Sequence, residues 1–426
     1  MNVQYLYLAF YFLSLLFIFL ALYNKDKSLI YHSPFMIFNI IWLIIFLVYL
    51  SVDDFLSSNT VSILILFHFF FLVFALLFIS LYKKKKEMIY RAEVTTTKSI
   101  ILVFIQSLSV CAALAYINAA LNANGIGLIA AYSGDVSIRD IIAFNDYSVP
   151  IWAKLLNQLN YLNLLLPIAF VIYKRDSLIF LCIALLLSTL YNIIFMQRSG
   201  VLLILVVVLF TYLRVNDVRF STVIKVVVPS FLFFILVSVF ILFSRGIGLE
   251  GVWRNFSDYL LGGISGFQAF YDGYSGTVFN VAEKSSTIGL KEFSIESVDF
   301  MGNHIPFVYG FLMKLGFIEQ QFSSNHDVFV YSPVATNIYT WYKAFLLDFW
   351  YFGVVLFPFI YCFLVYLVMR FFYYKLSVFS IFLCSYVFYM FFRSFGGIAF
   401  DLKTIVMTFL LSLAMSKFIN ERADER

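Results

Sequence analysis

The chain has 426 residues, of which 63% are hydrophobic and only 12% are Asp, Glu, Lys or Arg. Soluble globular proteins are usually about 25% charged, so this surplus of apolar residues cannot all be buried in a water-soluble core. The net charge of +5 is small and does not indicate nucleic-acid binding. The composition therefore excludes an ordinary soluble protein and predicts an integral membrane protein.

About eleven apolar runs approach the roughly 17–25 residues that a helix needs to cross a bilayer. They predict an all-α polytopic membrane protein with about eleven transmembrane helices. The sixth and seventh runs are separated only by the short stretch 197–200, which predicts a helical hairpin with Arg198 at its tip. The predicted spans are 3–22, 34–50, 61–82, 99–119, 152–173, 177–196, 200–215, 222–243, 344–369, 377–395 and 404–418.

Lysine and arginine are distributed unevenly between alternate connections. One set is rich in both, whereas the opposite short connections hold only Arg139, Arg198 and Lys403. Cytoplasmic loops carry an excess of these residues, so we expect the N-terminus outside and the C-terminus inside. The predicted organisation is helices 1–8 over residues 1–243, a large outer loop over 244–343, and helices 9–11 with a short cytoplasmic tail over 344–426. Amphipathic helices are expected in the loop, at Val252–Leu261 and Ile305–Leu315.

Two features suggest special chemistry and have plainer interpretations. The lysine run 83–86 directly follows an apolar span, so we interpret it as a cytoplasmic anchor rather than as a nucleic-acid patch. The four cysteines each fall inside an apolar span without a Cys-x-x-Cys spacing, so we expect small buried hydrophobic residues and no disulfide or metal site. They are Cys111, Cys182, Cys362 and Cys384.

The fifth span carries a polar stripe made of Lys154, Asn157, Asn160 and Asn163. Spacing of three places these residues on one helical face. That face should look into the bundle, because polar groups facing lipid would stay unsatisfied. Interhelical hydrogen bonding is the plainer interpretation, and a ligand site is the alternative.

Five charged residues are expected near one membrane depth, at the outer level. Charged groups inside a bilayer cost about 2.5–3.5 kcal/mol each on insertion scales, so those that remain are informative. Guanidinium groups bind phosphate oxygens bidentately, which predicts an anionic ligand such as a lipid diphosphate. Positioning at the interface is the alternative for any single arginine. The five are Arg198, Arg245, Arg254, Asp348 and Arg393.

Other catalytic signals are few. His304 and His326 lie in the predicted outer loop, and either can serve as a general base near pH 7 or be an ordinary surface histidine. Asp53-Asp54 lies in the first outer connection, a place where some metal-dependent membrane glycosyltransferases carry acidic residues, and helix capping is the plainer interpretation. The chain has no nucleotide-binding glycine loop, zinc spacing or nucleophile elbow, so we expect no cofactor.

Three segments carry a resemblance to a known family. The first is Met196-Gln197-Arg198-Ser199-Gly200, and the second is Ser244-Arg245-Gly246 at the start of the long loop. The third closes the loop, with Asn337, Tyr339 and Thr340 followed by Asp348-Phe349-Trp350 and Gly353. The chain thereby resembles the Wzy-type O-antigen polymerases, which often show Asn-x-Tyr-Thr and then Asp-Phe-Gly-x-x-Gly. Trp350 stands where the first glycine of that pattern is expected.

The resemblance implies an enzyme of the bacterial inner membrane that acts at the periplasmic face. It would transfer a growing chain from undecaprenyl diphosphate onto the next lipid-linked oligosaccharide repeat, without nucleotide sugar or metal. Membrane lipids and a chain-length regulator protein are the candidate partners, and nucleic acid is not one. The predicted catalytic residues are Arg198, Arg245, Arg254, His304 and His326, and the predicted substrate-binding residues are Asn337, Tyr339, Thr340, Tyr342, Asp348 and Arg393.

Two other functions remain as alternatives. An O-antigen ligase, or another lipid-linked glycosyltransferase, would share the many-helix plan and the large outer loop. A flippase or secondary transporter of polysaccharide intermediates belongs to another class, in which internal repeats and charges near the midplane are typical. The chain shows no repeat and its charges gather at one level, which favours the polymerase.

Overall fold

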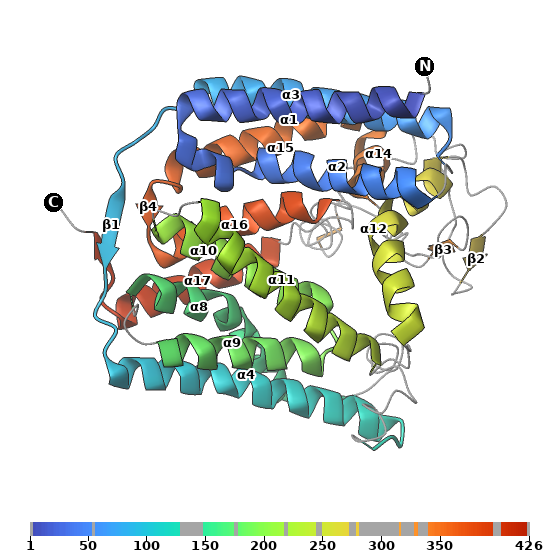
Figure 1. The fold of residues 1–426 in the computed structure, drawn as a ribbon. Helices are drawn as coiled ribbons and strands as arrows, with labels where there is room; N and C mark the ends of the chain where they lie inside the picture. The colour runs from blue at the N-terminus through green and yellow to red at the C-terminus, as the bar shows by residue number, and fades with distance from the viewer. Residues whose placement is uncertain are drawn as a thin grey trace. The chain divides into compact units, whose positions relative to one another are not determined.

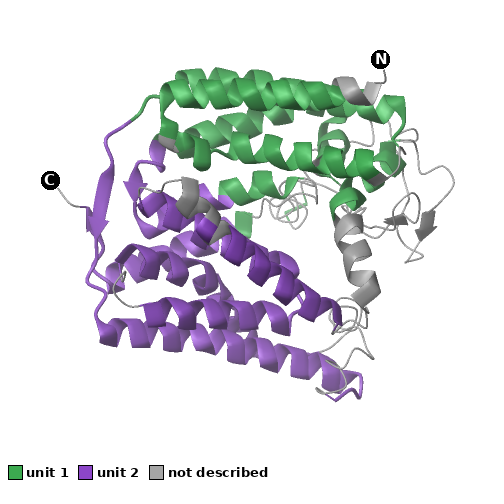
Figure 2. Cartoon of the chain, viewed as in Figure 1, with its two compact units in different colours: residues 1–84, 254–370, 387–403 green, residues 85–253, 371–386, 404–426 purple. Residues whose placement is uncertain are grey.

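The computed structural model describes residues 3–52, 56–127, 148–173, 178–216, 220–243, 249–271, 278–280, 315–316, 328–330, 340–394 and 402–423. The chain forms two compact units, coloured in Figure 2. Unit 1 comprises residues 1–84, 254–370 and 387–403, and unit 2 comprises residues 85–253, 371–386 and 404–426. The two units are defined by compact packing, whereas the three regions predicted from the sequence are defined by their position relative to the membrane. The units therefore do not test the predicted regions.

Unit 1 is built on three long apolar helices near the N-terminus. Helix α1 (Val3–Lys25) packs against both α2 (Pro34–Val52) and α3 (Ser58–Leu81) (Figure 1). Ser57 caps α3, because its hydroxyl accepts a hydrogen bond from the Thr60 N–H at 3.2 Å. The later elements of unit 1 are η1 (Lys27–Tyr31), most of α12 (Leu249–Tyr271), the antiparallel strands β2 (Val278–Asn280) and β3 (Val328–Val330), α14 (Trp341–Phe349), η5 (Trp350–Phe352) and most of α15 (Gly353–Phe371).

Unit 2 has its core between α4, α9 and α10. Val110 and Ile117 of α4 pack with Tyr191 of α9, Val201 of α10 and Ile241 of α11. Small residues on α4, such as Ala113 and Ala120, let neighbouring helices approach closely. The elements are α4 (Thr96–Ala123), α7 (Ile151–Leu156), η2 (Asn157–Tyr161), α8 (Leu162–Tyr173), α9 (Leu178–Ile194), α10 (Arg198–Val215) and α11 (Phe220–Phe243). Helix α16 (Val378–Phe392) is divided between the units, and α17 (Leu402–Phe418) lies mostly in unit 2.

Each predicted span has a helical counterpart in the structure. Seven helical stretches of the described chain are long and apolar enough to cross a membrane, and three shorter apolar stretches accompany them. This confirms a predominantly helical chain with the character of a membrane protein. The number of spans and their orientation stay predictions. The seven are Tyr7–Lys25, Pro34–Ser51, Ser58–Leu81, Thr96–Ala123, Ile151–Tyr173, Arg198–Val215 and Tyr342–Phe371, and the shorter ones are Leu178–Ile194, Val228–Phe243 and Val378–Phe392.

The predicted ninth span is not one continuous helix. It divides at Trp350, a non-glycine residue with a positive φ of 53°, and resumes as α15 at Gly353. The two helices approach so closely there that a Cβ on Gly353 would lie 2.2 Å from the Phe345 carbonyl oxygen. Only glycine fits at this contact, which gives the last residue of the Asp348–Gly353 motif a packing role.

The expectation of four buried cysteines is wrong for two of them. Cys362 and Cys384 are buried, whereas Cys111 and Cys182 are exposed on the surfaces of α4 and α9. An apolar residue in a spanning helix can face lipid as readily as protein, so position within an apolar run does not predict burial. All four are free thiols.

The asparagines of the polar stripe form interhelical hydrogen bonds, as the plainer interpretation predicted. The Gln106 side-chain amide on α4 donates to Asn163 Oδ1 at 2.9 Å. The Tyr191 hydroxyl on α9 donates to Asn157 Oδ1 at 2.9 Å and accepts from Asn160 Nδ2 at 3.0 Å. Lys154, the fourth member of the stripe, is exposed.

Basic connections gather within each unit. In unit 2, β1 (Met88–Arg91) pairs in parallel with β4 (Lys375–Leu376) and antiparallel with β5 (Arg422–Ala423). These strands join three connections that the Lys and Arg bias assigns to the cytoplasmic side. Arg214 at the end of α10 adds a fourth, through a 2.7 Å ion pair with Glu87. Burial and the nearby Glu421 carboxylate raise the pKa of the Tyr90 hydroxyl on β1.

In unit 1 a hydrogen bond and an ion pair likewise connect the C-terminal ends of α1 and α3. Lys25 Nζ donates to the Ser80 carbonyl oxygen at 2.6 Å, and Lys84 pairs with Asp26 at 3.0 Å. These contacts join two connections that the Lys and Arg bias assigns to the same side of the membrane. They do not say which side of a membrane the connections face.

Candidate functional site

The start of α14, where the chain returns from the long connection, is buried in unit 1. Thr340, Tyr342 and Lys343 expose 2%, 0% and 5% of their surfaces, and Asp348 at the end of the same helix exposes 0%. The Thr340 N–H donates to the Gly263 carbonyl oxygen of α12 at 3.2 Å. Buried polar and charged groups therefore lie along α14, with Thr340 and Lys343 at its start and Asp348 near its end.

Tyr342 connects the start of α14 to His68, a buried histidine on α3. The Tyr342 hydroxyl lies 2.9 Å from His68 Nε2, and the Tyr11 hydroxyl from α1 lies 2.6 Å from the same nitrogen. The Tyr7 hydroxyl lies 3.0 Å from that of Tyr11. His68 Nδ1 lies 2.7 Å from the Leu64 carbonyl oxygen, which can only accept, so Nδ1 carries a proton and donates to it. In the neutral ring Nε2 is then the acceptor for both tyrosine hydroxyls.

Aromatic rings enclose the His68 and Tyr342 pair. Phe67 stacks on Tyr342 with ring centroids 4.4 Å apart, and Trp42 lies 5.3 Å from Tyr342 and 4.9 Å from His68. The indole N–H of Trp42 donates to Ser394 Oγ at 2.8 Å, just beyond α16. Side chains from α1, α2, α3 and α14 therefore meet around one imidazole. This packing fixes the beginning of α14, which is the kind of rigid support that functional groups need.

Lys343 is a charged residue of this region that sequence reasoning missed. Its Nζ lies 5.4 Å from the centroid of the Phe270 ring on α12, a cation–π contact. A signal was present in the sequence, because a lysine at the outer end of a predicted span departs from the bias that otherwise places basic residues on the inner side. His68 was missed for another reason, since its tyrosine partners lie on helices far away in the sequence.

The predicted site residues in the described chain fall into both units. Tyr342 and Asp348 belong to α14, Thr340 directly precedes it, and Arg393 directly follows α16; all four lie in unit 1. Arg198 is the first residue of α10, in unit 2. Arg254 lies on α12, whose described side chains begin at residue 260. Arg245, His304, His326, Asn337 and Tyr339 lie outside the described residues.

The segment around Arg198 has a local explanation. The turn between α9 and α10 uses a positive φ of 52° at Met196. A Cβ on Gly200 would lie 1.6 Å from Asn192 Oδ1 on α9, so the glycine two positions after Arg198 leaves room for the Asn192 side chain. Joint action of Arg198, Arg245 and Arg254 on one diphosphate stays a prediction.

A metal centre is not seen among the described residues, where no group of three or more His, Cys, Asp or Glu side chains could hold an ion. Asp53 and Asp54 lie outside the described residues. The prediction of a metal-independent site is therefore untested.

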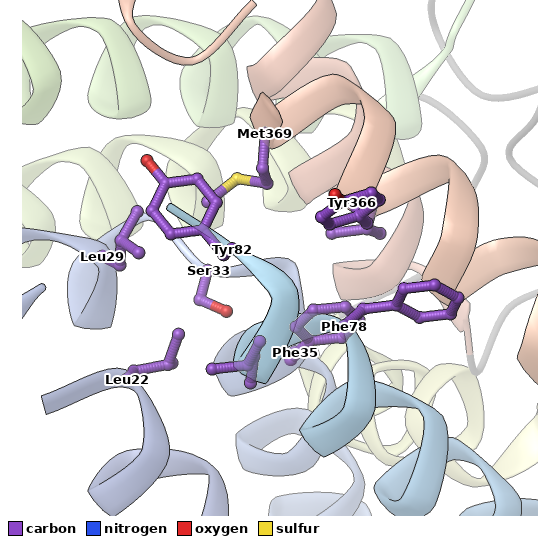
Figure 3. Close-up of a pocket in the computed structure, with 10 residues that line it drawn as sticks. Leu22, Leu29, Ser33, Phe35, Phe78, Tyr82, Tyr366 and Met369 are labelled. Carbon is purple, nitrogen blue, oxygen red and sulfur yellow. The ribbon is translucent and has the colours of Figure 1, made fainter. Parts of the chain in front are cut away.

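A small pocket in unit 1 lies away from the start of α14 (Figure 3). Its wall is largely apolar, with Leu22, Phe35, Phe78 and Met369 around the Ser33 hydroxyl. Phe78 follows His68 by ten positions on α3, which is about 15 Å along a helix. The pocket is thus separate from the candidate site.

Comparisons with known proteins identify no relative. No protein-family model, curated protein or solved structure matches the chain. The case for a function therefore rests on the sequence motifs and on the physical character of the buried groups around α14.

Proposed function

We propose that this chain is an O-antigen polymerase, a membrane glycosyltransferase that extends an oligosaccharide carried on undecaprenyl diphosphate. Its place would be the bacterial inner membrane, with about eleven spans and the active site facing the periplasm. The observation that carries the proposal is the burial of Lys343 and Asp348 in α14, the helix that follows the long connection, and of Thr340 directly before it. Ionisable residues at membrane depth mark functional sites by default.

The reaction needs two things from the protein, a base and a group of cations. The bond between the anomeric carbon and the diphosphate oxygen breaks, and the leaving diphosphate takes the electron pair. The acceptor sugar hydroxyl forms the new bond and loses its proton to a base. Preorganised cations stabilise the charge that develops on the leaving group. The chain offers arginines and lysine for that last task, and His304 or His326 for proton transfer.

The direct test is turnover by the purified protein. With an undecaprenyl-diphosphate-linked repeat as the only sugar source, we expect products of two or more repeats, formed also in excess chelator. A requirement for magnesium or manganese would instead favour an acidic-loop mechanism with Asp53 and Asp54. Transfer to a lipid A core acceptor without chain growth would identify a ligase, and the absence of any transfer would contradict the proposal.

A cellular test separates polymerisation from export. Deletion of the gene should reduce surface glycan to a single repeat on the lipid A core. Complete loss of surface glycan would instead favour the transporter.

One variant with a matched control tests the buried carboxylate of α14. Asp348→Asn keeps the size of a fully buried carboxylate and removes its charge, and we expect normal abundance in the membrane with loss of polymer. Asp26→Asn makes the same change in a carboxylate paired with Lys84 and should remain active. If Asp348→Asn instead removes the protein from the membrane, the carboxylate has a folding role.

The three predicted phosphate-binding arginines are tested in the same way. Arg198→Lys, Arg245→Lys and Arg254→Lys keep the charge and lose the bidentate geometry, so each should reduce polymer formation substantially. Arg422→Lys, on the exposed strand β5, is the control. Normal polymerisation by all three variants would exclude the arginine clamp.

A further inference from the structure

The pocket of Figure 3 lies where several helices of unit 1 end or begin. Its wall is formed by the C-terminal parts of α1, α3 and α15, by η1 and by the first residues of α2. Leu22, Phe35 and Phe78 are among its apolar side chains, and all three are buried. In a membrane protein the ends of apolar helices lie where the hydrocarbon of the bilayer gives way to the lipid headgroups.

The Ser33 hydroxyl points into this pocket (Figure 3). Ser33 exposes 1% of its surface, and its Oγ has no hydrogen-bond partner among the described residues. Serines inside helices of the same unit, such as Ser51 and Ser62, donate to a carbonyl oxygen of the preceding turn at 2.7 and 2.8 Å. Ser33 directly precedes Pro34, where α2 begins, so the helix offers it no preceding turn. A buried hydroxyl without a partner is unfavourable, and an acceptor on a bound molecule would satisfy it.

A buried water is a poor candidate for that acceptor. An internal water ordinarily makes about two to four hydrogen bonds, whereas the wall around Ser33 is almost wholly apolar. The hydroxyl of Tyr366, which also lines the pocket, already accepts a hydrogen bond from Arg370 at 2.6 Å. The pocket therefore suits an apolar molecule that carries one acceptor group. An acyl chain that begins at an ester carbonyl is such a molecule.

The helix ends beside the pocket carry an excess of positive charge. In unit 1 these ends and the residues next to them hold five basic residues and one acidic residue, Asp26. Lys25 lies beside the wall, because its Nζ donates at 2.6 Å to the carbonyl oxygen of Ser80, next to Ile79. Basic residues are common at helix ends, but beside an apolar pocket they favour a lipid with an anionic headgroup. The five are Lys25, Lys27, Lys83, Lys84 and Arg370.

We propose that the pocket binds the first part of one acyl chain of an anionic glycerophospholipid. The Ser33 hydroxyl donates to the ester carbonyl oxygen, the apolar wall surrounds the methylene groups that follow, and the basic helix ends attract the phosphate. On the predicted orientation the lipid belongs to the cytoplasmic leaflet. An isoprenoid chain has no ester carbonyl for Ser33, so the site is distinct from that of the lipid carrier and does not rest on the proposed function.

The test is lipid binding to the full-length protein, measured by native mass spectrometry after delipidation in detergent. The probes are phosphatidylglycerol with ester-linked chains, the same lipid with ether-linked chains, and ester-linked phosphatidylcholine. We expect Ser33→Ala to weaken binding of the ester-linked phosphatidylglycerol about two- to tenfold, the effect of one hydrogen bond, and to leave binding of the ether-linked lipid nearly unchanged. Ser14→Ala is the matched control, because Ser14 Oγ is also buried without a partner among the described residues but does not line the pocket.

A second variant tests the apolar wall. Leu22→Phe adds bulk inside the pocket and should weaken binding of both forms of phosphatidylglycerol severalfold. Leu20→Phe makes the same change at an exposed position of the same helix and should weaken neither. Ser33→Ala removes a hydroxyl that makes no described bond in the lipid-free protein, so its unfolding temperature should not fall, and this variant decides the question if Leu22→Phe fails to fold.

The remaining outcomes would overturn the proposal. Equal effects of Ser33→Ala on the ester-linked and ether-linked lipids would exclude the bond to the ester carbonyl, as would an equal loss of binding in Ser14→Ala. Equal binding of phosphatidylglycerol and phosphatidylcholine by the wild type would exclude an anionic ligand. Binding of farnesyl diphosphate more tightly than phosphatidylglycerol, lost in Leu22→Phe, would assign the pocket to an isoprenoid chain instead. Polymer formation is measured separately, and its absence would reject the proposed function and leave this site standing.

Discussion

The hydrogen bonds around His68 predict a strong energetic coupling between two tyrosines on different helices. Tyr342→Phe removes one bond of 2.9 Å and leaves Nε2 its bond to Tyr11 at 2.6 Å. Such a loss costs about 0.5–1.5 kcal/mol. Tyr11→Phe removes both that bond and the 3.0 Å contact with the Tyr7 hydroxyl, so about 1–3 kcal/mol is expected for two bonds. Either single variant leaves the imidazole satisfied.

The double variant differs in kind from the two single variants. With both hydroxyls gone, Nε2 becomes a buried acceptor with no tyrosine partner, and the full desolvation penalty of about 1–3 kcal/mol is added. The double variant should therefore be less stable than the sum of the single effects by about 1 kcal/mol or more. The measurement is equilibrium unfolding of the purified protein in detergent for the wild type and the three variants.

A second cycle provides the control. Tyr366 accepts a hydrogen bond from Arg370 at 2.6 Å, at an exposed position on α15, and shares no partner with Tyr11. Tyr11→Phe combined with Tyr366→Phe should be additive within about 0.5 kcal/mol. Additive behaviour of the Tyr11 and Tyr342 pair, equal to that of the control pair, would refute the shared acceptor and the neutral imidazole that it implies.

The break between α14 and α15 and the topology of the chain give three further predictions. Gly353→Ala should destabilise the protein by about 1–3 kcal/mol or more in the same unfolding assay, because the new Cβ would lie 2.2 Å from the Phe345 carbonyl oxygen; unchanged stability would contradict that approach. Trp350→Gly should be more stable than Trp350→Ala by about 1 kcal/mol or more, since both lose the ring but only glycine relieves the φ of 53°; the reverse order would contradict this backbone conformation. A periplasm-dependent phosphatase fused after Asp327 should be active and one fused after Arg422 inactive, and the opposite pattern would reverse the predicted orientation.

Local patterns in the sequence were enough for the helical plan. Hydropathy is a property of consecutive residues, and a helix satisfies its own backbone in lipid, so runs such as 61–82 could be located without tertiary information. The asparagine stripe was also predictable, because helical periodicity alone puts Asn157, Asn160 and Asn163 on one face. The sequence did not indicate that Gln106 and Tyr191 would be their partners.

The candidate site was predictable only in part. The motif drew attention to Thr340, Tyr342 and Asp348 because they stand where a long polar stretch gives way to an apolar run. Their burial, and the roles of Lys343 and His68, depend on contacts between segments that are far apart in the chain. Burial of an ionisable group depends on which helices surround it. Hydropathy along the chain does not predict which helices those are. The sequence by itself thus determined a helical chain of membrane character, and tertiary packing decided which polar groups are enclosed at the start of α14.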